Sequence, residues 1–181
     1  MHNLLIKNKK DVIKNNNTLK DKSYLTHLIK DDLKQVNNFM IANIKSEVPL
    51  IPLLSEYLLN SGGKRIRPAL TILFSKLFGY NYGTRHIQLS SCIEFIHMAS
   101  LLHDDVVDGS ALRRGKKTAN RIWGNKASVL VGDYLFSKAF QIMVADRDYK
   151  VLENLSATSK SLAQGEVMQL SLTNNLDINE K

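Results

Sequence analysis

Residues 92–117 read CIEFIHMASLLHDDVVDGSALRRGKK, and the rest of the chain is organised around this stretch. Its first half is apolar and contains no glycine or proline before the acids, a pattern that predicts a buried helix. At about 100° per residue, His97, Leu101, Asp104 and Asp108 fall on one stripe of that helix. Two carboxylates therefore lie one turn apart on one face, and a glycine and a basic segment follow them.

Acidic residues cluster at the end of this predicted helix, where Asp105 adds a third carboxylate to Asp104 and Asp108. Close carboxylates repel one another, and the helix macrodipole disfavours acids at a C-terminus. A DDxxD sequence by itself is usually a solvated face, but two apolar turns precede this one. All-oxygen ligands suit Mg²⁺, which binds one or two carboxylates together with substrate phosphates. The pattern therefore predicts a Mg²⁺ site.

Basic residues follow the acids closely, and a second basic stretch, SGGKRIRP, occupies residues 61–68. Arginine presents a planar fork of donors that recognises phosphate bidentately. The glycine pair can bring backbone N–H groups close to an anion, although such pairs also simply end helices. Together the two stretches predict a diphosphate site beside the metal site. The basic residues after the acids are Arg113, Arg114, Lys116 and Lys117.

Four motifs in order and spacing carry a resemblance to a known family: GGKRIRP at 62–68, HMASLLHDDVVD at 97–108, RRG at 113–115 and GDYLFSKAF at 132–140. They resemble the trans-isoprenyl diphosphate synthases, and among them the long-chain, octaprenyl-type polyprenyl enzymes. The resemblance implies an all-α isoprenoid-synthase-type helical bundle. It also implies a prenyltransferase that condenses isopentenyl diphosphate with an allylic diphosphate. The product would be a long-chain all-trans polyprenyl diphosphate, the precursor of quinone side chains such as that of ubiquinone.

The same resemblance implies roles for individual residues. Asp104 and Asp108 would hold Mg²⁺, with Asp105 assisting, and Arg113 would contact the allylic diphosphate as part of the catalytic set. His97 on an apolar face would otherwise be read as a core histidine. The residues that match contacts to isopentenyl diphosphate are Lys64, Arg67, His97 and Arg114.

Product length is expected to depend on Ala99 and Ser100, which lie one turn before Asp104. A prenyl tail must grow away from the charged end of the helix and pass these positions. Small side chains leave such a tunnel open, whereas aromatic rings would close it, because a packed interior has no slack. The sequence therefore predicts a long product.

Composition indicates a globular protein: 181 residues, 44% hydrophobic and 23% charged. No apolar run approaches the ~20 residues of a membrane span. The single cysteine, Cys92, is expected to have a packing role in a reducing compartment, so we expect a cytoplasmic protein. No strand-like alternation is present, and helical periodicity predicts helices at 25–44, 52–59, 69–78, 84–108, 127–145 and 151–172, with 69–78 buried.

The net charge of +8 suggests nucleic acid as a possible ligand, but its distribution opposes that interpretation. Within residues 1–22, six lysines and two aspartates contribute half of the total. No aromatic residues are interleaved with the basic ones. We therefore expect a basic Asn/Lys-rich arm at 1–24 and a synthase portion at 25–181, with no nucleic-acid partner and no transmembrane segment.

One departure from the family is expected to matter: the second aspartate-rich motif and the Lys-Thr pair that the family carries in its C-terminal half have no counterpart after Asp133. The chain is therefore interpreted as the N-terminal portion of a synthase, truncated and with little activity alone. It would act as a homodimer or with a complementing C-terminal half; the alternative is a noncatalytic subunit or remnant. Gln164 stands where the family commonly has an acid, so no catalytic role is expected in residues 164–170.

Overall fold

The structure is a computed structural model that describes residues 27–80 and 82–172. Over these residues the chain is helical apart from one short hairpin, which confirms the predicted all-α fold. The predicted arm at 1–24 lies outside the described residues. In chain order the elements are α3 (Lys30–Asn43), α4 (Leu50–Asn60), α5 (Ile66–Leu77), α6 (Arg85–Val107), β1 (Leu112–Arg113), β2 (Lys116–Lys117), α7 (Ala119–Trp123), α8 (Asn125–Asp146) and α9 (Tyr149–Leu172).

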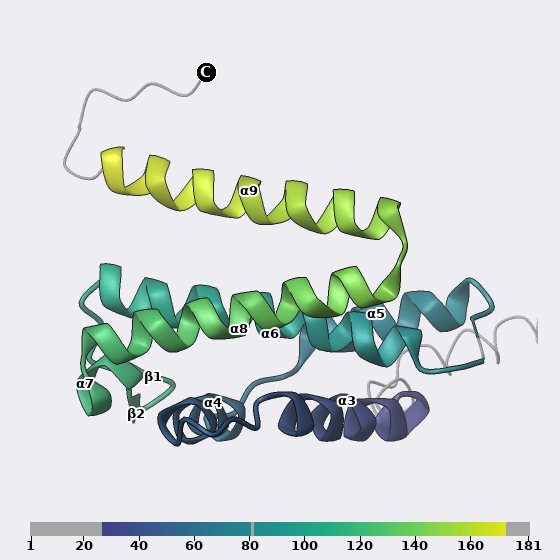
Figure 1. The fold of residues 1–181 in the computed structure, drawn as a ribbon, viewed down its shortest axis with the longest axis horizontal. Helices are drawn as coiled ribbons and strands as arrows, with labels where there is room; N and C mark the ends of the chain where they lie inside the picture. The colour runs from purple at the N-terminus through teal and green to yellow at the C-terminus, as the bar shows by residue number, and fades with distance from the viewer. Residues whose placement is uncertain (1–26, 81, 173–181) are drawn as a thin grey trace, which may run out of the picture.

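Helix α6 is the centre of the bundle, because α3, α5 and α8 all pack against it (Figure 1). Its buried residues lie on several sides and include Phe95, Met98 and Leu102. A helix that is apolar on several sides needs neighbours on several sides. Cys92 has the expected packing role, and its burial raises the pKa of the thiol to about 12, so it stays protonated at neutral pH.

The end of α6 is fixed directly after the acids by a glycine. Gly109 adopts a left-handed φ of 61°, its N–H donates to the carbonyl of Val106, and the N–H of Ser110 donates to that of Asp105. These two bonds form a Schellman motif, which satisfies carbonyls that the helix end would leave unpaired. The chain therefore leaves the helix at the position where the acids lie, and the basic hairpin follows at once.

The basic segment forms a hairpin that the sequence patterns did not predict. Strand β1 pairs antiparallel with β2, and Leu112 lies opposite Lys117. Arg114 and Gly115 make the turn, and both have positive φ, of 53° and 77°. Two positive φ values in a two-residue loop are the signature of a type I′ turn, which suits the twist of paired strands.

The expectation that residues 69–78 are buried is wrong for much of that segment. The buried residues of α5 are Pro68 and Ile72, whereas Phe74 and Leu77 are 55% and 74% exposed. Helix α5 packs on α6 through one stripe, and among the described elements α3 is the other one that contacts it substantially. A uniformly apolar run does not reveal which of its faces has a neighbour.

Helix α8 matches its prediction within two residues and packs along α6. Among the described helices it is the one with the length and the mean hydropathy of a membrane span, 1.2 over its most apolar window. Core helices pass the same test, so this is weak evidence for a membrane. Val131, Leu135 and Ala139 are buried in the core.

Helix α9 stands away from the rest of the bundle along most of its length (Figure 1). None of its residues is buried between Tyr149 and Leu172. The turn before it is held by Arg85, whose Nε and Nη2 donate to Asp146 at 2.7 and 2.8 Å and whose Nη2 also donates to Asp148 at 2.7 Å. One arginine therefore joins the start of α6 to the turn between α8 and α9.

Candidate functional site

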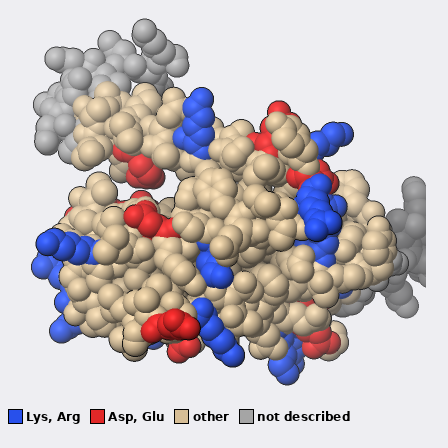
Figure 2. Space-filling model, viewed as in Figure 1, with Lys and Arg blue, Asp and Glu red and all other residues tan. Residues whose placement is uncertain are grey.

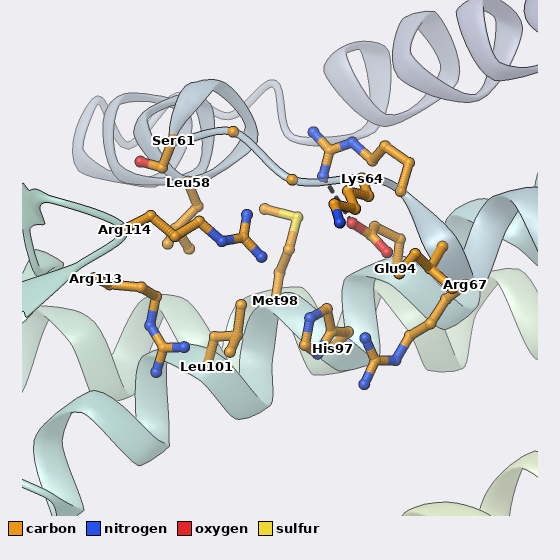
Figure 3. A pocket seen from close by; sticks show the side chains of 14 residues that line it. Leu58, Ser61, Lys64, Arg67, Glu94, His97, Met98, Leu101, Arg113 and Arg114 are labelled. Atoms are coloured by element: carbon orange, nitrogen blue, oxygen red, sulfur yellow. Dashed lines mark hydrogen bonds and ion pairs between the residues drawn. The ribbon is translucent and has the colours of Figure 1, made fainter. Parts of the chain in front are cut away.

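Three segments that are distant in the sequence enclose a pocket of about 90 Å³, which we call the basic pocket (Figure 3). The glycine loop before α5, helix α6 and the β1–β2 hairpin each form part of its wall. The structure thus brings together the residues for which the sequence analysis expected contacts to isopentenyl diphosphate. Its charged and titratable lining residues are Lys64, Arg65, Arg67, Glu94, His97, Arg113 and Arg114.

The close approach of the hairpin to the glycine loop depends on Gly63. A Cβ at this position would lie 2.6 Å from Nη1 of Arg114, so a side chain here would displace that guanidinium. Arg114 itself occupies the first position of the hairpin turn. Glycine at 63 therefore lets a positive charge lie against the backbone of the loop, as an anion site requires.

Side-chain hydrogen bonds fasten the hairpin to α4. The hydroxyl of Tyr57 donates to the carbonyl of Lys117 at 2.5 Å, and Nζ of Lys116 donates to that of Asn60 at 3.2 Å. The Tyr57 ring also meets Trp123 edge to face. The basic pocket is thus braced by bonds between separate elements.

His97 lies in the basic pocket beside Arg67. Its burial, and next the positive charge of Arg67, lower the pKa of the imidazole, while Glu94 opposes this shift. The ring is therefore neutral at pH 7 and offers one donor and one acceptor nitrogen. A neutral ring can donate a hydrogen bond to a phosphate oxygen without adding another charge to a crowded site.

Asp105 points away from the other two acids. It is 1% exposed, and Arg113 grips its carboxylate through Nε at 3.0 Å and Nη2 at 2.8 Å. Its carbonyl accepts from Nδ2 of Asn120 at 3.0 Å. Among the residues that the structure describes, no three acidic, histidine or cysteine side chains converge as metal ligands. Asp105 is therefore paired inside the protein, whereas Asp104 is half-buried and Asp108 is exposed.

A larger cavity of about 460 Å³ lies between α6, α8 and α9, and we call it the cleft. Figure 2 shows the hollow between α9 and the rest of the molecule, with acidic side chains on both sides. Its walls are mostly apolar. Ile96, Phe136, Leu162 and Val167 line it, and Asp104 lies among its polar residues.

Asp104 faces an acid that the sequence analysis did not select. Its burial, and next the negative charge of Glu166, raise the pKa of its carboxyl, while Arg113 lowers it. Glu166 is on α9 and lines the same cleft. A signal was present in the sequence, since Ser159, Ala163 and Glu166 follow one another at helical spacing.

The carboxylates around Asp104 form a set of oxygen ligands that would be more stable with a hard divalent cation bound than without one. The negative charge of Glu166 disfavours the ionised form of Asp104 and raises its pKa, and Asp108 adds to the effect. Oxygen ligands of this kind suit Mg²⁺ or Ca²⁺. Asp104 and Asp108 would hold such an ion, and Glu166 would interact with it electrostatically.

His103 and Asp133 form one edge of the cleft where α6 meets α8. Their closest atoms, Nε2 and Oδ1, are 3.4 Å apart. Gly132 permits this packing, because a Cβ there would collide with the imidazole. His103 and Asp104 therefore line the same cavity.

A third cavity of about 140 Å³ shares lining residues with both sites. It shares Arg67 and His97 with the basic pocket and Ser100 and Leu162 with the cleft. Ala99 and Ser100 both line the cleft, one turn before Asp104, where the sequence analysis placed a tunnel. The basic pocket and the cleft are therefore both adjacent to this third cavity along α6.

Comparison with known sequences identifies the relatives of this chain. The sequence profile of the Polyprenyl synthetase family matches residues 48–181. The octaprenyl diphosphate synthase of Escherichia coli K12 is 46% identical over 157 residues, which are 87% of this chain and 48% of that protein. The all-trans-nonaprenyl-diphosphate synthase (geranyl-diphosphate specific) of Rhodobacter capsulatus is 38% identical over 153 residues, 84% and 47% of the two chains. The chain spans about half the length of the curated relatives it matches.

Solved structures agree with the sequence relatives. A decaprenyl diphosphate synthase from Rhodobacter capsulatus superposes with a TM-score of 0.83 at 44% identity and covers 87% of this chain and 48% of its own. A polyprenyl synthase from Caulobacter crescentus CB15, complexed with calcium and isoprenyl diphosphate, gives 0.82 at 45% identity and covers 86% and 47%. These neighbours confirm the predicted isoprenoid-synthase-type helical fold.

Proposed function

This chain belongs to the polyprenyl synthetase family, and we propose that it carries the first metal site and both diphosphate sites of a long-chain prenyltransferase. The reaction joins isopentenyl diphosphate to an allylic diphosphate and yields an all-trans polyprenyl diphosphate for quinone side chains. The observation that carries the proposal is the pair of cavities on either side of α6. One is lined by cations and the other by carboxylates and apolar walls.

In this proposal the basic pocket binds the diphosphate of isopentenyl diphosphate. Lys64, Arg67 and Arg114 supply charge, and neutral His97 supplies a hydrogen bond. The isopentenyl group then extends through the third cavity, past Ser100, towards the cleft. This arrangement holds the nucleophilic double bond of isopentenyl diphosphate at a fixed distance from the allylic diphosphate, which lowers the entropic part of the barrier.

The cleft receives the allylic diphosphate. Asp104 and Asp108 would hold Mg²⁺, which would supply positive charge to stabilise the diphosphate as a leaving group. Arg113 is oriented by Asp105, and its Nη1 group has no partner among the described residues, so it remains available to a phosphate oxygen. The apolar walls beyond Asp104 exclude water from the allylic cation and accept the prenyl tail.

The chemistry requires three bond changes. The C–O bond of the allylic diphosphate breaks and the diphosphate takes the electron pair. The double bond of isopentenyl diphosphate then forms a C–C bond to the allylic carbon, and a proton is lost to restore a double bond. Stabilising the developing charge of the leaving group is the main task of the protein, and Arg113 is the residue of this chain best placed to share it.

We further propose that full turnover needs more than these 181 residues, supplied by a complementing C-terminal half in a dimeric, cytoplasmic enzyme. The named relatives are about twice as long. Addition of the C-terminal half of the Escherichia coli octaprenyl diphosphate synthase, in trans or by fusion, should then produce activity. Binding without turnover in that assay would favour the alternative, a noncatalytic subunit.

Calorimetry with Mg²⁺ and inorganic pyrophosphate tests the site assignment directly. Asp104→Asn and Asp108→Asn should each weaken Mg²⁺-dependent binding by about tenfold or more, which corresponds to ~1.4 kcal/mol. Asp31→Asn, which removes an exposed carboxylate on α3, is the matched control and should change nothing. Unchanged binding in both site variants would refute the proposed metal site.

A further inference from the structure

The basic pocket contains an acid that an anion site should not tolerate. Glu94 lines it together with Lys64, Arg67 and His97, and it is 5% exposed (Figure 3). A buried carboxylate that lacks a partner is strongly destabilising, and it would recruit the same cations that a bound diphosphate needs. Something in the pocket must therefore satisfy Glu94.

Arg65 satisfies it. Nη1 of Arg65 donates to Oε1 of Glu94 at 2.7 Å, the ion pair that reaches Glu94 as a dashed line in Figure 3. Nη2 of the same guanidinium donates to the carbonyl of Leu59 at 2.8 Å. One side chain therefore joins the last turn of α4, the start of α5 and the centre of α6.

The backbone of Arg65 has an unusual conformation at this contact. It adopts a left-handed conformation, with φ 47° and ψ 40°, directly before α5 begins. Such a conformation is unfavourable for a residue with a side chain, and it persists only where the surroundings impose it. In this conformation the side chain of Arg65 donates hydrogen bonds to Glu94 and to the carbonyl of Leu59. Its neighbours Lys64 and Arg67 line the pocket and make no hydrogen bond to Glu94 among the described residues.

We propose that Arg65 is a positioning residue of the basic pocket, which neutralises Glu94 so that Lys64, Arg67 and Arg114 stay available to a diphosphate. The inference rests on the proposed function only in taking a diphosphate as the ligand of this pocket. Arg65 acts through Glu94 and does not itself bind the ligand. Its effect on affinity therefore depends on the charge at position 94.

This dependence is tested by a double-mutant cycle with inorganic pyrophosphate as the probe, measured by calorimetry on the 181-residue chain. Arg65→Met should weaken binding by about tenfold, because Glu94 then competes for the pocket cations. Glu94→Gln should bind as tightly as the parent or more tightly. Arg65→Met combined with Glu94→Gln should return to within about threefold of the parent.

Two other roles for Arg65 give different results. If Arg65 contacts the ligand, the double variant will bind as weakly as Arg65→Met. If it is only a structural tether, melting temperature and affinity will fall together in the single and double variants alike. Either result overturns the proposal. Lys76→Met is the matched control, since it breaks an ion pair with Asp32 outside the pocket and should leave affinity unchanged.

A conservative variant keeps the test decisive if Arg65→Met does not fold. Arg65→Lys retains the positive charge but cannot reach both Glu94 and Leu59 as a fork does. It should lower the melting temperature yet bind pyrophosphate within about threefold of the parent, and a tenfold loss would overturn the proposal. A folded parent that binds no pyrophosphate would refute the proposed function itself, an outcome distinct from a failed cycle.

Discussion

The basic pocket and the cleft lie on either side of the same helix but are built in opposite ways. Bonds between separate elements brace the basic pocket, including Arg65 to Glu94 and Tyr57 to the carbonyl of Lys117. The cleft is closed on one side by α9, which has no buried residue between Tyr149 and Leu172. The basic pocket is held in shape by bonds between its elements, whereas the wall of the cleft that α9 forms has little packing to hold it in place.

Their electrostatics differ in the same way. The single acid in the basic pocket has an arginine partner, and Lys64, Arg67 and Arg114 make no ion pair among the described residues. In the cleft, Asp104 faces Glu166, and its raised pKa records the unfavourable charge. A preorganised site binds its ligand without reorganisation, whereas an unbalanced one needs a cation first. We therefore expect pyrophosphate binding without metal at the basic pocket and only with metal at the cleft.

The largest expected effect concerns Arg113, which belongs to both sites: it lines the basic pocket and lowers the pKa of Asp104. Arg113→Lys in the completed enzyme should lower turnover by about a hundredfold, because a point charge cannot grip Asp105 and a phosphate together. Steady-state product formation is the measurement. Arg121→Lys, on the exposed face of α7, is the control. Equal turnover for Arg and Lys at 113 would show that only charge matters.

A second effect should appear in product length. An aromatic ring at Ala99 or Ser100 narrows the cleft one turn from Asp104, so Ala99→Phe and Ser100→Phe should replace a long product by short ones. Chromatography of the products of the completed enzyme measures this. Ala157→Phe, at an exposed position of α9, should leave the products unchanged. A long product from both cleft variants, or a short product from the parent, would contradict the tunnel assignment.

A pair of glycine variants separates binding from stability at the basic pocket. Gly63→Ala should displace Arg114 and weaken pyrophosphate binding by about fivefold, and it should also lower the melting temperature, because φ at this position is +159°. At Gly62 a Cβ meets no other atom, but φ is +82°. Gly62→Ala should therefore cost roughly 1 kcal/mol of stability and spare affinity. A loss of pyrophosphate affinity in Gly62→Ala but not in Gly63→Ala would mean that Arg114 does not face the ligand.

The smallest effect is a pH dependence of the metal-free cleft. Burial and Glu166 raise the pKa of Asp104 above its usual 3.8, so its ionised form opposes folding at neutral pH. This opposition fades as the pH falls through the raised pKa towards 4. Asp104→Asn should therefore raise the free energy of unfolding at pH 7 by a few tenths of a kcal/mol, and the gain should vanish in acid. Urea titrations at several pH values, with Asp31→Asn as control, would detect it; a gain that grows in acid would contradict it.

Helical periodicity alone predicted most of the fold. The 3.6-residue pattern around Phe95 and Leu102 located α6, and Gly109 marked its end. The pattern did not reveal which side of α5 is covered, because Phe74 and Ile72 are equally apolar and differ only in their neighbours. Nor did it reveal the hairpin, since two-residue strands are too short to show alternation.

The candidate site was predicted where its residues share a motif and missed where they do not. Asp104 and Asp108 stand out because they are close in sequence. Glu166 does not, because it meets Asp104 only through the packing of α9. The direction of Asp105 was missed for a related reason, since Arg113 on the hairpin and Asn120 on α7 decide it.

The contact between Arg85 and the turn before α9 has a consequence for amide hydrogen exchange. Beyond that contact, α9 has few partners, so its N–H groups should exchange through local opening, with protection far below that of α6. Both ion pairs of Arg85 involve a partly exposed guanidinium, and salt weakens such pairs. Ionic strength should therefore set how often α9 opens. The wall of the cleft would then respond to salt while the basic pocket, held by buried and backbone partners, keeps its exchange pattern.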